Sequence, residues 1–309
     1  MSEIRIISRK PIDKGWSGDQ KYCAEDPSGK KYLLRVSPIG QYERKKAEFE
    51  HMKTVAALGI PMCLPLKFGI SDEGVYSVQS WIDGTDAEAV LPTLSEEERY
   101  AYGFRAGELL RKIHTIPAPE EIENWEARFN RKIDRKIRLY SECPLKYDVD
   151  APFLAYIEAH RALLRNRPQT YQHGDYHVGN MMIDRSGVLH VIDFNRDDYG
   201  DPWEEFNRIV WCAQSAPTFA SGMVDGYFER TVPIEFWELL ALYIASNTLS
   251  SLPWAIPFGD GEIQTMRRQA NDVLAWYDGM KTPIPSWYQS VPRKENHNAR
   301  TPADSRDPL

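Results

Sequence analysis

The stretch HGDYHVGN at residues 173–180, followed by VIDF at residues 191–194, decides how this chain is interpreted. Asp175 is followed by the amide Asn180 five residues later, and by the carboxylate Asp193 thirteen residues beyond that. Phosphoryl transfer from a nucleotide needs a carboxylate that orients the attacking hydroxyl and accepts its proton, and oxygen ligands that hold Mg²⁺ on the phosphates. Either short motif alone is common in turns, but the ordered and spaced set predicts a phosphoryl-transfer centre.

The residues between the two motifs support this interpretation. The apolar run at residues 188–192 is typical of a strand that ends at Asp193, and the sequence DRSG at residues 184–187 is typical of a hairpin turn. Because a hairpin brings its two open ends together, Asn180 and Asp193 are expected to lie close to each other.

Residues 1–82 are predicted to form a sheet-rich lobe with one helix. The helix is expected over residues 42–58, because Phe49, Met52 and Ala56 share a face and the sequence GIP at residues 59–61 ends it. Strands are expected at residues 21–25, 30–36, 64–70 and 75–81, with turns at residues 26–29 and 72–74.

Residues 83–291 are predicted to form a larger, mainly helical lobe after a linker at residues 82–86. Ser95 and Glu98 form a capping box, which starts a helix with apolar residues at helical spacing. Further helices are expected over residues 121–140, 152–165, 203–213, 233–246 and 262–277. The polar tail at residues 292–309 is expected to be disordered. The sequence therefore predicts an α+β protein with two lobes.

The motif HGDxxxxN followed by IDF resembles the signature of the aminoglycoside phosphotransferase family, a distant relative of the protein kinases. The resemblance implies a protein-kinase-like two-lobed fold, with a small N-terminal antiparallel sheet lobe and a larger helical C-terminal lobe. It implies that ATP or GTP donates the γ-phosphate to a hydroxyl of a small molecule. By the same resemblance Asp175 is the catalytic base, and Asn180 and Asp193 are Mg²⁺ ligands.

The resemblance also assigns supporting residues in the second lobe. His173 is expected to brace the catalytic loop, and the sequence GDP at residues 200–202 brings Asp201 to the start of a helix. Glu205 stands where the family usually has an aspartate, which concerns a supporting contact rather than the chemistry. His177 and His114 are expected to be structural.

In the first lobe, Arg35 occupies the strand position where the family commonly has a phosphate-binding lysine. Arginine also binds phosphate, bidentately and with a permanent charge. Glu48 is the expected helix partner of Arg35, and Glu50 is the alternative. The loop at residues 15–19, with Ser17 and Gly18, is expected to cover the phosphates. Backbone groups of Ser80 and Ile82 are expected to bind the adenine edge.

The acidic residues Asp197, Asp198 and Glu204 are predicted to face the acceptor. They would suit a cationic acceptor such as an aminoglycoside, although acidic residues also favour the start of a helix. Two other hypotheses stay open. One is a housekeeping kinase of an amino alcohol or sugar; the other is a nucleotide-binding pseudoenzyme that acts as an interaction module, supported only by Arg35 in place of lysine.

Bulk composition limits the partners and the compartment. A net charge of −7 argues against binding to nucleic acid, which needs a basic surface. The four cysteines form no C-x-x-C pair, which is typical of a reduced, cytoplasmic protein. No run of about 20 apolar residues is apparent, so no membrane is expected. The protein is expected to be a monomer or homodimer.

Overall fold

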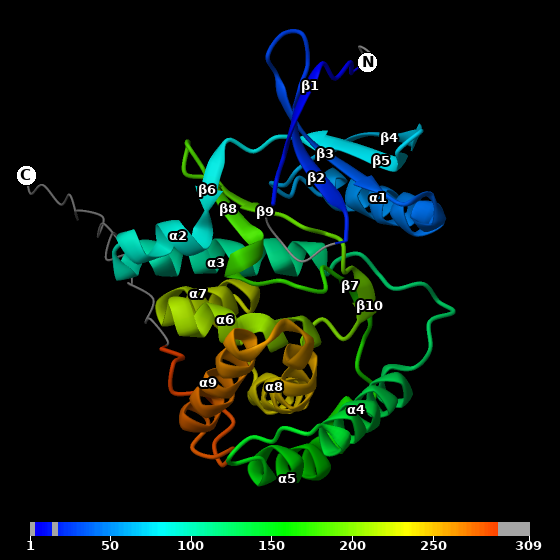
Figure 1. The fold of residues 1–309 in the computed structure, drawn as a ribbon. Coiled ribbons are helices and arrows are strands. Elements are labelled where there is room, and N and C mark those ends of the chain that lie inside the picture. Colours follow the sequence, from blue (N-terminus) through cyan, green and yellow to red (C-terminus); the bar gives the residue numbers. More distant parts are fainter. Residues whose placement is uncertain (1–3, 14–17, 290–309) are drawn as a thin grey trace, which may run out of the picture.

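The computed structural model describes residues 4–13 and 18–289, which form two lobes (Figure 1). The upper lobe contains an antiparallel sheet and the helix α1, and the lower lobe contains the helices from α2 to α9. The predicted α+β class and the division into a sheet-rich and a helical lobe are confirmed. The predicted tail at residues 292–309 lies outside the described residues.

The upper sheet has five strands in the order β1-β2-β3-β5-β4, and all its pairs are antiparallel. The Asp26 carboxylate makes the turn between β2 and β3 by accepting the backbone N–H groups of Ser28 (2.9 Å) and Lys30 (3.1 Å). The helix α1 packs on the sheet through Phe49, whose ring lies 5.4 Å from that of Phe68. The elements are β1 (Ser8–Pro11), β2 (Gln20–Glu25), β3 (Lys31–Ser37), η1 (Ile39–Gln41), α1 (Tyr42–Ala57), β4 (Pro65–Ser71) and β5 (Gly74–Ser80).

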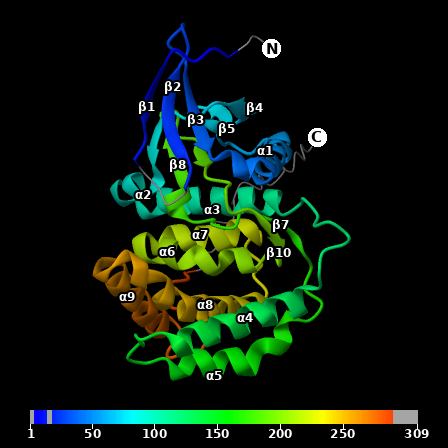
Figure 2. The same cartoon turned by 45° about the vertical axis from the view of Figure 1, so that its right-hand side comes forward.

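Of two small sheets, the one with β8 lies between the upper sheet and the helices, and the other lies at the side of the helices (Figures 1 and 2). In one, β8 (Met181–Asp184) pairs with both β6 (Gly84–Asp86) and β9 (Leu189–Val191). In the other, β7 (Thr170–Gln172) pairs with β10 (Asp198–Gly200). The Asp184 carboxylate closes the β8–β9 turn by accepting the N–H groups of Ser186 and Val188 at 2.8 and 3.0 Å. The predicted hairpin therefore exists, and it carries the two sequence motifs at its open end.

The lower lobe is built from helices around a large apolar core. The predicted capping box is present at the start of α3, where Ser95 and Glu98 bond each other's backbone N–H groups. The helices are α2 (Ala87–Val90), α3 (Glu96–Ile113), α4 (Trp125–Glu142), α5 (Ala151–His160), α6 (Ile209–Ser215), α7 (Pro217–Tyr227), α8 (Ile234–Ala255) and α9 (Asp260–Trp276). Short 3₁₀ turns are η2 (Leu91–Thr93), η3 (Arg161–Leu164), η4 (Val178–Asn180), η5 (Glu204–Arg208) and η6 (Ile256–Phe258).

The helix α7 is absent from the sequence-based expectations, because Ser221, Gly222 and Gly226 lower its helix propensity. These small residues are explained by packing against α3. A Cβ atom at Gly222 would lie 2.3 Å from the carbonyl oxygen of Tyr100, and a Cβ atom at Gly107 of α3 would lie 2.1 Å from that of Met223. The two helix backbones therefore approach each other too closely for any larger residue.

Replacing Gly107 by Ala should destabilise the protein, because the new methyl group cannot avoid backbone atoms of α7. We expect a loss of about 1–3 kcal/mol in the free energy of unfolding, the usual cost of overpacking. Chemical denaturation measures this loss. Gly261→Ala is the matched control, because a Cβ atom there meets nothing within 4 Å. An equal stability change in both variants would contradict the close packing of α3 and α7.

The segment Ile234–Phe258, which contains α8, corrects the expectation that the sequence has no apolar stretch of membrane-spanning length. It is long and apolar enough to cross a membrane, and it is the only such helix among residues 4–13 and 18–289. Its most apolar window is 67% buried, because α4, α5 and α9 pack around it. Its apolar character is therefore accounted for by its place at the centre of the lower lobe.

Candidate phosphoryl-transfer site

The backbone at Gly174 positions the catalytic loop. Gly174 has a φ of +82°, and a Cβ atom there would lie 1.9 Å from the carbonyl oxygen of Arg196, so only glycine fits. Its N–H donates to both carboxylate oxygens of Glu205, at 2.9 and 3.2 Å. His173 is fully buried, with Nε2 2.9 Å from the carbonyl oxygen of Ile192. Glu205 therefore makes the supporting contact to the catalytic loop, although the family usually has the shorter aspartate at this position. His173 connects the loop to the segment before Asp193.

Asp175 lies between an amide and three basic side chains. Asn180 Nδ2 donates to the Asp175 backbone oxygen at 2.8 Å and to Oδ2 at 3.2 Å. Arg208 Nε is 3.3 Å from Oδ1, Arg196 Nη1 is 3.6 Å from Oδ2, and His177 Nε2 is 3.8 Å from Oδ1. Burial alone would raise the pKa of Asp175, but His177 and the two arginines outweigh it and hold the pKa well below its ordinary value. Asp175 is therefore a carboxylate at neutral pH.

Asp193 faces the cleft between the lobes from a left-handed backbone conformation, with a φ of 67°. Its Oδ1 accepts a hydrogen bond from Arg35 Nη1 at 2.9 Å. Burial favours the protonated form of Asp193, but the charges of Arg35 and Lys21 prevail and lower its pKa. Asp193 therefore brings a negative charge to the same cleft that Asn180 lines.

The oxygen atoms of this cleft fit Mg²⁺. Within the described part of the chain, no partner occupies Asn180 Oδ1 or Asp193 Oδ2, and amide and carboxylate oxygens are the ligands that Mg²⁺ prefers. No group of three or more His, Cys, Asp or Glu residues among those described could hold a metal ion by itself. Asn180 and Asp193 would therefore hold Mg²⁺ together with the phosphates of a nucleotide and water.

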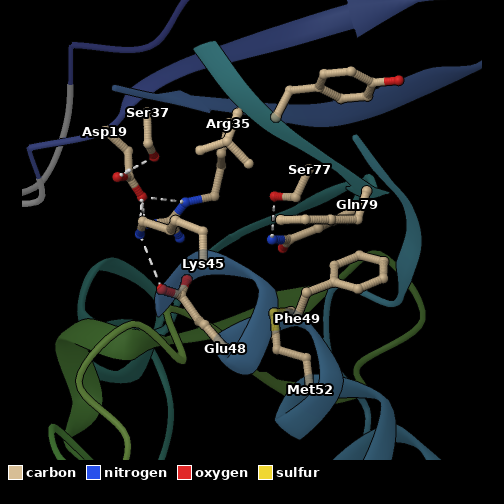
Figure 3. Close-up of a pocket in the computed structure, with 12 residues that line it drawn as sticks. Asp19, Arg35, Ser37, Lys45, Glu48, Phe49, Met52, Ser77 and Gln79 are labelled. Atoms are coloured by element: carbon tan, nitrogen blue, oxygen red, sulfur yellow. Dashed lines mark hydrogen bonds and ion pairs between the residues drawn. The ribbon is translucent and has the colours of Figure 1, made fainter. Parts of the chain in front are cut away.

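A buried ionic network in the upper lobe corrects the expected partner of Arg35 (Figure 3). Arg35 Nη2 lies 2.8 Å from Asp19 Oδ2, and the same oxygen lies 2.8 Å from Lys45 Nζ. Glu48 pairs with Lys45 at 2.9 Å and not with Arg35, because Asp19 and Lys45 stand between them. The alternative, Glu50, is also wrong, because it pairs with the exposed Lys53 at 2.8 Å.

The charges in this network favour ionised Asp19. Burial alone would raise the pKa of Asp19, but hydrogen bonds from Lys45 and Ser37 and the charge of Arg35 lower it to about 2. Burial raises the pKa of Glu48, and the negative charge of Asp19 adds to this effect, although the charges of Lys45 and Arg35 oppose it. Asp19 is therefore the group that holds Arg35 in place.

Three charged residues of the site were not predicted from the sequence, namely Asp19, Lys21 and Lys45. A signal existed for Lys45, because it lies three residues before Glu48 on the same helix face. Lys21 lies directly opposite Arg35 in the β2–β3 register, and both side chains line the cleft. The position of Asp19 depends on how the chain enters β2, which no local pattern specifies.

The cleft between the lobes has a volume of about 240 Å³ and a lining that is partly apolar and partly polar. Leu33, Trp81, Ile82 and Met182 contribute apolar surface, which suits a nucleotide base. The polar lining residues are Lys21, Arg35, Gln79, Asp86, Asn180 and Asp193, which include the groups able to contact phosphates. The cleft therefore has the size and polarity that part of a nucleotide requires.

Three expected nucleotide contacts have different outcomes. Ser80 is not among the residues that line the cleft, and its backbone N–H already donates to Leu64 O at 2.9 Å, so this N–H is not available to a nucleotide base. Ser17 lies outside the described residues. Gly18 is exposed and does not line the cleft.

The acidic residues expected to face the acceptor are each paired with a basic residue. Asp197 Oδ2 lies 2.5 Å from His51 Nδ1. Asp198 lies 3.5 Å from Arg128, and Glu204 lies 3.2 Å from Lys132. The buried Asp201 binds Arg167 Nε at 2.7 Å and the Tyr243 hydroxyl at 2.6 Å, so it connects the segment before η5 with α8 and with the loop before β7. These acids are therefore dispersed among ion pairs and do not form one negative surface.

Comparisons with known proteins agree with the two-lobed kinase-like fold. The family described as the phosphotransferase enzyme family matches residues 8–238. Because this match covers most of the chain, the chain belongs to the aminoglycoside phosphotransferase (APH) family, as the sequence motifs predicted. A search of curated protein sequences gives no significant match.

Several solved structures share the fold at low identity. A thermostable variant of aminoglycoside phosphotransferase APH(4)-Ia, in complex with AMP-PNP and hygromycin B, has a TM-score of 0.63 and 17% identity over 87% of this chain and 94% of its own. The gentamicin complex of APH(2")-IIa has a TM-score of 0.58 and 17% identity over 87% and 91%. A choline/ethanolamine kinase family protein from Mesorhizobium loti has a TM-score of 0.62 and 16% identity over 89% and 91%. These similarities establish the protein-kinase-like fold.

Proposed function

We propose that this protein transfers the γ-phosphate of ATP or GTP to a hydroxyl of a small molecule, with Asp175 as the group that receives the hydroxyl proton. The observation that carries the proposal is the convergence of Asp175, Asn180 and Asp193. Asn180 donates to Asp175 and also lines the nucleotide-sized cleft together with Asp193. The acceptor site would therefore meet the cleft at Asn180.

Each residue has a defined task in this proposal. Arg35 and Lys21 face the part of the cleft where phosphates would lie, and they supply positive charge there. Bound Mg²⁺, held by Asn180 and Asp193, would neutralise charge on the transferring phosphoryl group. Asp175 orients the hydroxyl, and its low pKa makes it a weak base, so its main contribution is position.

Two acceptor classes follow from the solved relatives. The relatives bound to hygromycin B and gentamicin suggest a cationic antibiotic, and the choline/ethanolamine kinase family protein suggests a small metabolite. The basic neighbours of Asp197, Asp198 and Glu204 favour a metabolite over a polycationic antibiotic, since these contacts reduce the negative charge that the three acids offer to ammonium groups. The intact catalytic constellation opposes the pseudoenzyme hypothesis.

Nucleotide binding tests this proposal. Calorimetry with ATP and with GTP, each with and without Mg²⁺, should show binding of at least one nucleotide that strengthens when Mg²⁺ is present. Mg²⁺ alone should bind only weakly, because two protein oxygens leave most of its coordination to other ligands. Failure of both nucleotides to bind in the presence of Mg²⁺ would refute the proposed function.

A further inference from the structure

A lysine on the core-facing side of α4 has a largely buried side chain and no polar partner among residues 4–13 and 18–289. Lys136 is 8% exposed and follows Trp125, Phe129 and Ile133 on that side of the helix. No described residue forms a hydrogen bond or an ion pair with it, and its ammonium nitrogen lies 6.0 Å from the centroid of the Phe129 ring. Its ammonium nitrogen is not among the described buried atoms that lack a hydrogen-bond partner, so the stem of the side chain is buried while its charged tip reaches solvent, where a ligand can meet it.

The charges around Lys136 lead to the catalytic aspartate. Lys132 on the same helix binds Glu204 at 3.2 Å, and the charges of Lys132, Lys136 and Arg208 together lower the pKa of Glu204 against the effect of its burial. Arg208 lies four residues after Glu204 and reaches Asp175 at 3.3 Å. The basic cluster, defined as Lys132, Lys136 and Arg208, therefore runs from the inner face of α4 to the site of phosphoryl transfer.

The balance of charge in this region is positive. Glu204 and Asp175 are the acids that contact the basic cluster, and Arg196 adds a further cation 3.6 Å from Asp175. The three cations of the basic cluster and Arg196 thus outnumber the two carboxylates, although the whole chain carries a net charge of −7. The charge near the site, and not the net charge of the chain, determines which ligand binds there, because salt at 0.1 M screens the interaction between exposed charges over about 10 Å.

We propose that the acceptor carries an anionic group, a carboxylate or a phosphate, and that Lys136, with Lys132 and Arg208, binds this group while the acceptor hydroxyl lies at Asp175. This inference rests on the proposed function and names its substrate class. An anion would give Lys136 the partner that the folded chain does not supply. A polycationic acceptor would instead be repelled by the cluster.

Anion binding to the nucleotide-loaded protein tests the inference. Mg²⁺ and AMP-PNP are first added to saturation, so that the nucleotide cleft is filled, and inorganic phosphate or malonate is then titrated by calorimetry at pH 7. We expect at least one of the two anions to bind, and the stronger binder indicates whether the acceptor group is a phosphate or a carboxylate. Lys136→Met should weaken that binding about tenfold to a hundredfold, the loss expected for one charged hydrogen bond.

Two further variants sharpen the test. Lys281→Met is the matched control, because Lys281 is exposed and its ion-pair partner in the described part of the chain is Asp278, so this variant should bind the anion as the wild type does. Glu204→Gln removes the acid that competes for the cluster, so it should tighten anion binding. Absence of anion binding in the wild type, or equal binding in Lys136→Met, would overturn the inference. Loss of AMP-PNP binding itself would instead refute the proposed function.

Thermal unfolding distinguishes a binding lysine from a structural one. Burial, with the charges of Lys132, Arg208 and Arg135, lowers the pKa of Lys136 to about 7 from 10.5, although Glu204 opposes this change. The cost of charging Lys136 in the folded state is therefore fully present below about pH 7, and it disappears as the pH rises toward 10.5. Lys136→Met should raise Tm at pH 6–7, and the gain should shrink toward pH 10. A lower Tm in this variant at pH 6–7 would show that Lys136 stabilises the fold.

Discussion

Asp175→Asn should lose phosphoryl transfer by roughly a hundredfold to a thousandfold while it binds nucleotide almost as tightly as the wild type. The carboxamide keeps the shape of the side chain but cannot accept the hydroxyl proton, and a positioned base contributes about 10²–10⁴ in rate. The lower part of this range is expected, because His177, Arg208 and Arg196 hold the pKa of Asp175 well below its ordinary value and make it a weak base. Steady-state transfer and nucleotide titration measure the two quantities.

Asp278→Asn is the control for this substitution. Asp278 is exposed, pairs weakly with Lys281, and has a φ of 46°, a conformation that asparagine tolerates well. Its transfer rate should equal that of the wild type. An active Asp175→Asn enzyme would show that the proton goes elsewhere, and a large loss of nucleotide affinity would place Asp175 in the nucleotide site.

The low pKa of Asp175 also determines how the transfer rate depends on pH. Because the folded pKa is depressed, Asp175 stays ionised as the pH falls from 8 to 6, so its protonation cannot slow the reaction in that range. A loss of rate in kcat/KM with an apparent pKa between 6 and 7 that disappears in Asp175→Asn would contradict this assignment.

Asp193→Asn should impair both nucleotide binding and transfer, because the substitution removes the negative charge that would hold Mg²⁺ on the phosphates. The metal contributes several kcal/mol of charge stabilisation, so the rate should fall by roughly a hundredfold or more. Arg35 loses its partner at 2.9 Å but stays bound to Asp19, so the upper lobe should keep its structure.

Magnesium titration separates the two aspartates. Raising the Mg²⁺ concentration should restore part of the activity of Asp193→Asn, since its defect lies in metal affinity, and should leave Asp175→Asn unchanged. Equal recovery of the two variants, or a normal magnesium requirement in Asp193→Asn, would show that the roles are assigned wrongly.

The sequence predicted those parts of the site that depend on local pattern. The turn at Asp184 is specified by its own side chain, and the resulting hairpin brings Asn180 and Asp193 to one cleft as expected. The capping box at Ser95 and the helix over residues 42–58 are likewise local and are confirmed. The roles of Asp175, Asn180 and Asp193 stay predictions that the variants above test.

The parts that the sequence did not predict depend on contacts between distant segments. Glu48 was paired with Arg35 by resemblance, but Asp19 enters from the start of β2 and takes Arg35, which leaves Glu48 to Lys45. The acids near residues 197–204 looked like one cluster in the sequence, but the fold supplies each with a basic partner from another helix. Lys136 was not singled out from the sequence, because only the fold shows that its stem is buried and that no described residue pairs with it.

Transfer of label from the γ-phosphate tests the central claim most directly. The wild type, Asp175→Asn and Asp278→Asn are incubated with Mg²⁺, γ-labelled ATP or GTP, and the small-molecule filtrate of a cell extract, and the labelled products are separated by chromatography. We predict a labelled phosphate ester of a small molecule, formed by the wild type and Asp278→Asn and reduced at least a hundredfold in Asp175→Asn. Label that stays in the nucleotide, or that appears only as inorganic phosphate or on protein, would contradict the account.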